Sequence, residues 1–115
     1  MFIDLNKVGI YAIVGFTDMR KQITGLASIL YDITEINLQD PNIFIFCGRT
    51  KKIIKVLYWD SNGFCLWQKK LGKDLFPWPK TERDLKELDL SKLRLLLKGI
   101  DFWKEHQKID SKYLF

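Results

Sequence analysis

Basic and aromatic side chains alternate through the middle of the chain, between residues 44 and 80. This segment holds eight of the sixteen aromatic residues and carries a net charge of +6, whereas the whole chain carries +5. Its basic residues are Arg49, Lys51, Lys52, Lys55, Lys69, Lys70, Lys73 and Lys80. Cationic groups displace counterions from phosphates, and flat rings stack on bases. The pattern therefore favours a surface that binds a polyanion such as DNA.

A second polar group, Asp18-Met19-Arg20, stands just before a predicted helix. In one interpretation Asp18 caps the helix and Arg20 is an exposed cation without a role. In the other, Arg20 lies beside the helix N-terminus and binds a phosphate or a partner carboxylate. The sequence leaves both open.

Catalytic chemistry has little support. A metal-dependent nuclease needs several carboxylates around metal ions, and here Asp18, Asp60 and Asp84 have ordinary explanations as cap, turn and surface residues. Neither a phosphate-binding P-loop nor a glycine-rich dinucleotide motif occurs. One histidine, His106, and no Cys-x-x-Cys pair make a zinc site improbable. We expect no enzyme, no cofactor or metal, and no small-molecule substrate.

The length of 115 residues predicts one domain, and the pI of about 9.2 favours acidic partners. No apolar run approaches the ~20 residues that cross a bilayer, and the N-terminus lacks a secretory pattern. We therefore expect a cytoplasmic protein without a membrane partner, in which Cys47 and Cys65 are buried thiols.

These residues must be positioned by a small set of elements. The patterns predict strands at 8–16, 42–48 and 51–59, an edge strand at 83–88, and helices at 18–34 and 90–98. Asp89 is a good cap for the second helix and Gly99 a good terminator. The expected fold is α+β: an antiparallel β-meander sheet centred on 43–71, with the two helices packed mostly on one side. The tail, 101–115, is either a short helix or a flexible basic arm.

The hairpin turn sets the predicted register. Asp60-Ser61-Asn62-Gly63 is typical of a three-residue loop with Gly63 in the left-handed conformation, which places Asp60 opposite Phe64 and Lys55 opposite Lys69. One sheet face then carries Ile54, Val56, Tyr58, Phe64 and Leu66, and the other carries Lys51, Lys55, Leu57, Trp59, Trp67 and Lys69.

The second face has two interpretations. Lysines can simply keep a sheet solvated and discourage edge pairing, or they can bind nucleic acid. Trp59 and Trp67 argue against plain solvation, because large aromatic rings on a surface usually meet a covering helix or a partner. The rigid segment Phe76-Pro77-Trp78-Pro79 either packs its two rings as a structural elbow or docks on a partner.

Three segments carry a family resemblance: GFTDMRKQITGLAS at 15–28, KVLYWDSNGFCLWQKKL at 55–71, and FPWP at 76–79. In that order they resemble the TnpB accessory proteins (Orf2-like) of the insertion sequence sixty-six family, which are unrelated to the RNA-guided nuclease of the same name. The resemblance spans nearly the whole chain. Gln22 and Thr24 depart from the family pattern. The turn that is usually arginine-rich reads Cys-Gly-Arg-Thr-Lys-Lys at 47–52, where the resemblance assigns the basic role to Arg49.

The resemblance implies a non-enzymatic role in assisting transposition, beside a separate DDE-type transposase and a second small accessory protein. It supports two functions equally. In the preferred one, the protein binds DNA through basic residues, namely Arg20, Arg49, Lys51, Lys55, Lys69 and Lys70. In the other, it is an adaptor that docks on the transposase through aromatic residues, namely Trp59, Trp67, Phe76 and Trp78.

Overall fold

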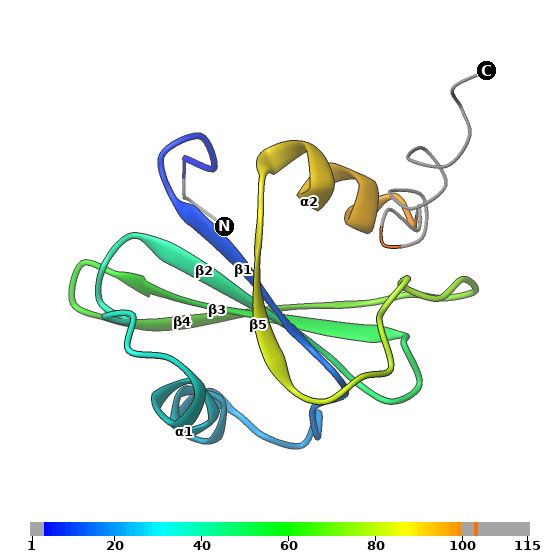
Figure 1. Cartoon of the computed structure of the whole chain (residues 1–115), viewed down its shortest axis with the longest axis horizontal. Coiled ribbons are helices and arrows are strands. Elements are labelled where there is room, and N and C mark those ends of the chain that lie inside the picture. Colours follow the sequence, from blue (N-terminus) through cyan, green and yellow to red (C-terminus); the bar gives the residue numbers. More distant parts are fainter. Residues whose placement is uncertain (1–3, 100–102, 104–115) are drawn as a thin grey trace.

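A five-stranded mixed sheet with one helix on each face forms the protein (Figure 1). The computed structural model describes residues 4–99 and residue 103. Its elements are β1 (Gly9–Val14), α1 (Ile23–Ile33), β2 (Asn42–Cys47), β3 (Ile53–Asp60), β4 (Gly63–Lys70), β5 (Asp84–Leu88) and α2 (Leu90–Leu97). The predicted α+β class is confirmed. Apart from Trp103, the predicted tail at 101–115 lies outside the described residues.

The strand order is β4-β3-β2-β1-β5, and it corrects the expected antiparallel meander. β2, β3 and β4 do form an antiparallel meander, but β1 pairs with β2 in parallel. The physical reason is that α1 carries the chain back along the sheet, so β2 starts at the same end as β1. β5 then pairs antiparallel with β1 and forms the second edge.

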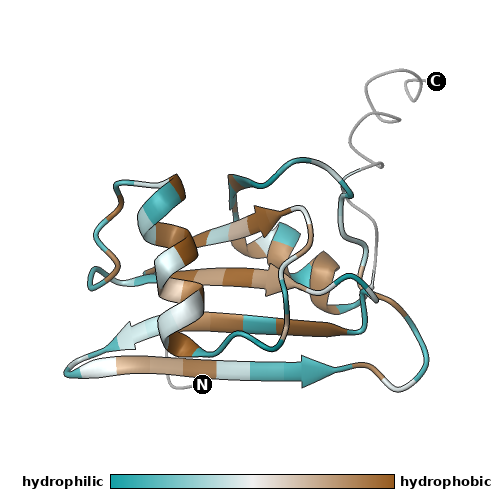
Figure 2. Cartoon of the chain, turned by 90° about the horizontal axis from the view of Figure 1, so that it is seen from below, coloured by the Kyte–Doolittle hydropathy of each residue, from teal (hydrophilic) through white to brown (hydrophobic). Residues whose placement is uncertain are grey.

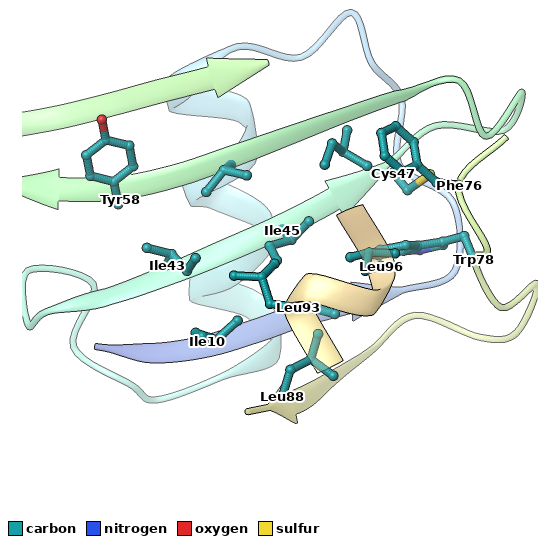
Figure 3. Close-up of a cluster of buried hydrophobic side chains, with 13 residues drawn as sticks. Ile10, Ile43, Ile45, Cys47, Tyr58, Phe76, Trp78, Leu88, Leu93 and Leu96 are labelled. Carbon is teal, nitrogen blue, oxygen red and sulfur yellow. The ribbon is translucent and has the colours of Figure 1, made fainter. Parts of the chain in front are cut away.

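The two helices cover opposite faces of the sheet, which corrects the prediction that both pack on one side (Figure 1). α1 packs Leu26 and Leu30 over one face, and α2 packs Leu93 and Leu96 over the other (Figure 3). Both covers are needed because β2 is buried on both sides, with every residue from Ile43 to Cys47 buried. Seen from the α1 side, hydrophobic colour runs along the strands while the loops are largely hydrophilic (Figure 2).

The helix boundaries are set differently at the two helices. α2 agrees with its prediction: an Asp89 side-chain oxygen accepts a hydrogen bond from the Lys92 amide at 2.8 Å, and Gly99 ends the helix with φ +79°. α1 begins at Ile23, five residues later than predicted. Asp18 instead closes the preceding turn, where its side chain accepts a hydrogen bond from the Arg20 amide at 2.9 Å.

The β3–β4 hairpin differs from its predicted register by one residue. Asp60 pairs with Gly63, so the loop has two residues, and Ser61 rather than Gly63 takes the left-handed conformation, with φ +51°. Lys55 consequently lies opposite Gln68. Because neighbouring positions of a strand point to opposite faces, this shift exchanges the faces of β4. Cys65 and Trp67 lie on the α2 side, and Phe64 and Leu66 on the α1 side.

The Phe76–Pro79 segment is a structural elbow. Phe76 and Trp78 are buried in the core on the α2 side (Figure 3). The Trp78 indole N–H donates a hydrogen bond of 2.9 Å to the Gly15 carbonyl, and the Gly15 amide donates one of 3.2 Å to the Pro79 carbonyl. The elbow therefore fastens the loop between β4 and β5 to the end of β1. Among the described residues, no helix is long and apolar enough to cross a membrane.

Candidate nucleic-acid interface

One end of the sheet gathers most of the basic residues. β1, β2 and β4 end there and β3 and β5 begin there, so the loops 15–22, 48–52 and 71–83 lie together. Backbone hydrogen bonds join these loops, from the Leu71 amide to the Lys52 carbonyl at 2.8 Å and from the Phe76 amide to the Lys51 carbonyl at 2.7 Å. We call this the basic end; it carries Arg20, Lys21, Arg49, Lys51, Lys52, Lys69, Lys70, Lys73, Lys80 and Arg83.

The basic end is clearly positive, and the opposite end of the sheet is negative. The acidic residues at the basic end are Asp18, Asp74, Glu82 and Asp84. The opposite end carries Asp4, Glu35, Asp40, Asp60 and Asp89, against Lys7 and Lys92. Such a separation of charge orients a protein in the field of a polyanion and raises its association rate.

A cleft of about 610 Å³ opens within the basic end. It lies between the loop that follows β1 and the loop that follows β2, outside the carboxyl ends of the two parallel strands, where α/β sheets commonly bind ligands. Its polar lining residues are Thr17, Asp18, Arg20, Arg49, Thr50 and Arg83. We call it the arginine cleft.

Close packing of the two loops shapes the cleft. The Thr17 amide donates a hydrogen bond of 2.9 Å to the Cys47 carbonyl and so ties the first loop to the end of β2. A Cβ on Gly48 would lie 2.5 Å from Met19 Cγ, so any larger residue there would displace the Met19 side chain. The cleft is therefore held by the sheet on one side and by the β1–α1 loop on the other.

Asp18 and Arg20 form an exposed bidentate ion pair at the cleft. Arg20 Nη2 lies 2.7 Å from Asp18 Oδ2, and Nε lies 3.0 Å from Oδ1. The hydrogen bond from the Arg20 side chain is the main cause that lowers the pKa of Asp18, and the same contact raises the pKa of Arg20. The Arg20 side chain remains 91% exposed. The pair adds little to stability, but it holds the guanidinium in place at the cleft.

The basic residues singled out in the sequence are placed unequally. Arg20, Arg49 and Lys70 are exposed at the basic end, and Lys51 and Lys69 are half-buried there. Lys55 is 2% exposed on the α1 side, and its Nζ donates a hydrogen bond of 2.9 Å to the Lys21 carbonyl. The expectation that Lys55 faces DNA is wrong, because the start of α1 covers the face of β3 on which Lys55 lies.

The aromatic residues singled out as partner contacts do not form one surface. Trp67 is half-buried on the α2 side opposite Val56, whereas Trp59 is half-buried on the α1 side and packs edge-on against Phe64 with ring centroids 5.0 Å apart. The rings of Phe76 and Trp78 are buried, which makes them core residues rather than docking residues.

Arg83 is one of the cleft residues that the sequence did not single out. It precedes the edge strand β5 and reaches the cleft because β5 pairs with β1, a partner more than sixty residues away. Within residues 4–99 and 103, no group of three His, Cys, Asp or Glu side chains could hold a metal ion.

The amino-acid sequence is similar to those of known proteins. A family model described as "IS66 Orf2 like protein" matches residues 8–107. An uncharacterized protein of Sinorhizobium fredii (strain NBRC 101917 / NGR234), y4hO, is 35% identical over 103 residues, covering 90% of this chain and 89% of that protein. No solved structure matches. The family match spans most of the chain and agrees with the resemblance found in its sequence, and on this ground the protein belongs to the IS66 Orf2-like family.

Proposed function

We propose that this protein is a non-enzymatic accessory protein of IS66-type transposition that binds the DNA backbone through its basic end. It acts in the bacterial cytoplasm beside the element's transposase and second accessory protein. The family match supports the role in transposition, and the separation of charge between the two ends of the sheet supports the contact with DNA.

The proposed contact is electrostatic and has little sequence preference. The exposed cations of the basic end lie on two loops, at the end of β4 and just before β5, so together they form a surface rather than a single strand face. They are Arg49, Lys70, Lys73, Lys80 and Arg83. Lysines that contact phosphates release counterions but read no bases. Lys55 has no part in this surface.

The test compares charge reversals at the two ends. Lys70→Glu with Lys73→Glu removes cations of the basic end outside the arginine cleft, and Lys7→Glu with Lys92→Glu makes the same change in net charge at the opposite end. The first pair should weaken binding to a fluorescent duplex at least tenfold, and the second should change it less than threefold. Wild-type affinity should fall with salt at a log–log slope of roughly −0.9 per phosphate contacted. Equal losses in both pairs, or no binding at low salt, would refute the proposal.

The adaptor function keeps one observation in its favour. An apolar hollow of about 230 Å³ opens between the sheet and α2, lined by Trp67, Val56, Leu93 and Leu97 among others. A half-buried tryptophan at such a hollow is a suitable anchor for a protein partner. Trp67→Ala should then lose capture of the cognate transposase while DNA binding persists. Capture at wild-type affinity by a folded Trp67→Ala protein would exclude this face.

A further inference from the structure

The arginine cleft is concave and differs in shape from the rest of the basic end. Its volume of about 610 Å³ lies within the range of pockets that enclose small ligands. Three arginines line it, Arg20, Arg49 and Arg83, and the only acidic residue of its lining is Asp18. A DNA duplex is convex, and its backbone phosphates meet flat or grooved surfaces. A concave cleft of this size instead suits one nucleotide unit.

Thr17 provides an independent observation. It lines the cleft and is 3% exposed, and its hydroxyl oxygen has no hydrogen-bond partner among the described residues. Buried hydroxyls in native proteins are nearly always paired, so each exception calls for an explanation. A threonine hydroxyl can donate a hydrogen bond to an anionic oxygen. Valine has nearly the same shape, so packing alone does not require the hydroxyl.

The chemistry of the lining selects phosphate, and a monoester over a diester. Arginine binds phosphate through two parallel N–H groups, and Asp18 leaves Nη1 of Arg20 without a partner among the described residues. A phosphate monoester offers three free oxygens and a charge of about −1.5 to −2 at neutral pH. A backbone diester offers two free oxygens and one charge. Three arginines and a hydroxyl match the monoester better.

We propose that the arginine cleft binds the phosphate monoester of a nucleotide, presented at the end of a DNA strand. Arg49 and Arg83 would neutralise the phosphate, Arg20 would be oriented toward it by Asp18, and the Thr17 hydroxyl would donate to one of its oxygens. This inference rests on the proposed DNA binding and deepens it, because it assigns a preference for strand ends to a protein whose basic surface binds the backbone generally.

The experiment uses fluorescent oligonucleotides of one sequence that carry a phosphate at the 5′ end, at the 3′ end, or at neither end. We expect wild-type protein to bind at least one phosphorylated form about tenfold more tightly than the unphosphorylated form. Thr17→Val and Arg83→Gln should each reduce this ratio to below threefold. Arg94→Gln, an exposed arginine of α2 outside the cleft, is the matched control and should preserve it. Thr17→Val should melt no lower than wild type, because it removes an unpaired buried hydroxyl.

Competition identifies the source of the phosphate. If a deoxynucleoside 5′-monophosphate removes the tenfold advantage only at concentrations far above those of the phosphorylated oligonucleotide, the ligand is a strand end. If it competes at equal concentration, the cleft chemistry stands but the strand-end assignment falls. A wild-type ratio near one, with salt-dependent binding of all three oligonucleotides, would overturn the cleft proposal and leave the general DNA binding intact. A ratio that persists in Thr17→Val and Arg83→Gln would overturn it as well.

Discussion

Reversing the charge of Lys55 should destabilise the folded domain rather than remove a DNA contact. The side chain is 2% exposed, and its ammonium has the Lys21 carbonyl as hydrogen-bond acceptor at 2.9 Å. In Lys55→Glu a carboxylate would occupy this site and face the same carbonyl oxygen, which cannot donate a hydrogen bond. The substitution therefore replaces a satisfied buried cation with an unsatisfied buried anion.

The expected size of the effect follows from that contact. A hydrogen bond to a charged group contributes ~1.5 to 3 kcal/mol, and leaving a buried charge without its partner costs about 3 to 5 kcal/mol. We therefore expect Lys55→Glu to lose about 4 kcal/mol, a large part of the ~5 to 15 kcal/mol by which domains are stable. Lys55→Met, which keeps the apolar stem and removes the charge, should lose only about 1 kcal/mol.

Urea unfolding followed by tryptophan fluorescence measures both variants. At an m value of about 2 kcal/mol per molar, Lys55→Glu should lower the midpoint by about 2 M. Lys55→Met should also bind DNA as tightly as wild type, since Lys55 lies outside the basic surface. An unchanged midpoint for Lys55→Glu, or loss of DNA binding by folded Lys55→Met, would contradict the structural role of Lys55.

Four further predictions concern the turn, the elbow and the cysteines. Ser61→Gly should stabilise the hairpin by up to about 1 kcal/mol because Ser61 has φ +51°, whereas Gly63→Ala should be neutral since a Cβ there meets nothing within 4 Å. Unchanged or lower stability of Ser61→Gly, together with a clear loss in Gly63→Ala, would contradict the two-residue loop. Gly15→Ala should lose more than about 1 kcal/mol in urea unfolding, because φ is +85° and the new Cβ would lie 2.8 Å from the Thr81 carbonyl oxygen. Trp78→Phe should lose about 1 to 3 kcal/mol by leaving the Gly15 carbonyl without its indole donor, and an unchanged melting temperature would exclude that contact. Burial raises the pKa of Cys47 to about 12, so at pH 8 about one in ten thousand of these thiols is ionised. Iodoacetamide should therefore label Cys65 before Cys47, and equal labelling of the two by mass spectrometry would show that Cys47 is accessible.

The elements that depend on neighbouring residues could be predicted from the sequence. Asp89 and Gly99 mark the ends of α2 because capping is decided within a single turn. The apolar run after Asn42 identifies β2 as a buried strand, and Phe76-Pro77-Trp78-Pro79 identifies the elbow. The family resemblance came from the same local segments, and the family model supports it.

The register of the β3–β4 hairpin could not be predicted from its turn residues alone. Asp60-Ser61-Asn62-Gly63 suits a loop of two residues as well as one of three, and the choice depends on how β4 packs. A difference of one residue exchanges the two faces of β4. The sequence placed Lys55 and Lys69 on one face of the sheet, whereas the packing places Lys55 beneath α1 and leaves Lys69 at the basic end.

The sequence by itself determined the elements, the excess of basic residues in 44–80 and the family. Only the tertiary structure decided which basic residues lie together, because strand order and pairing are contacts between distant parts of the chain. Parallel pairing of β1 and β2 brings the loops that carry Arg20 and Arg49 to one end, and pairing of β5 with β1 adds Arg83. Local propensity cannot specify such pairings, since each is stabilised by the burial of both sheet faces under the two helices.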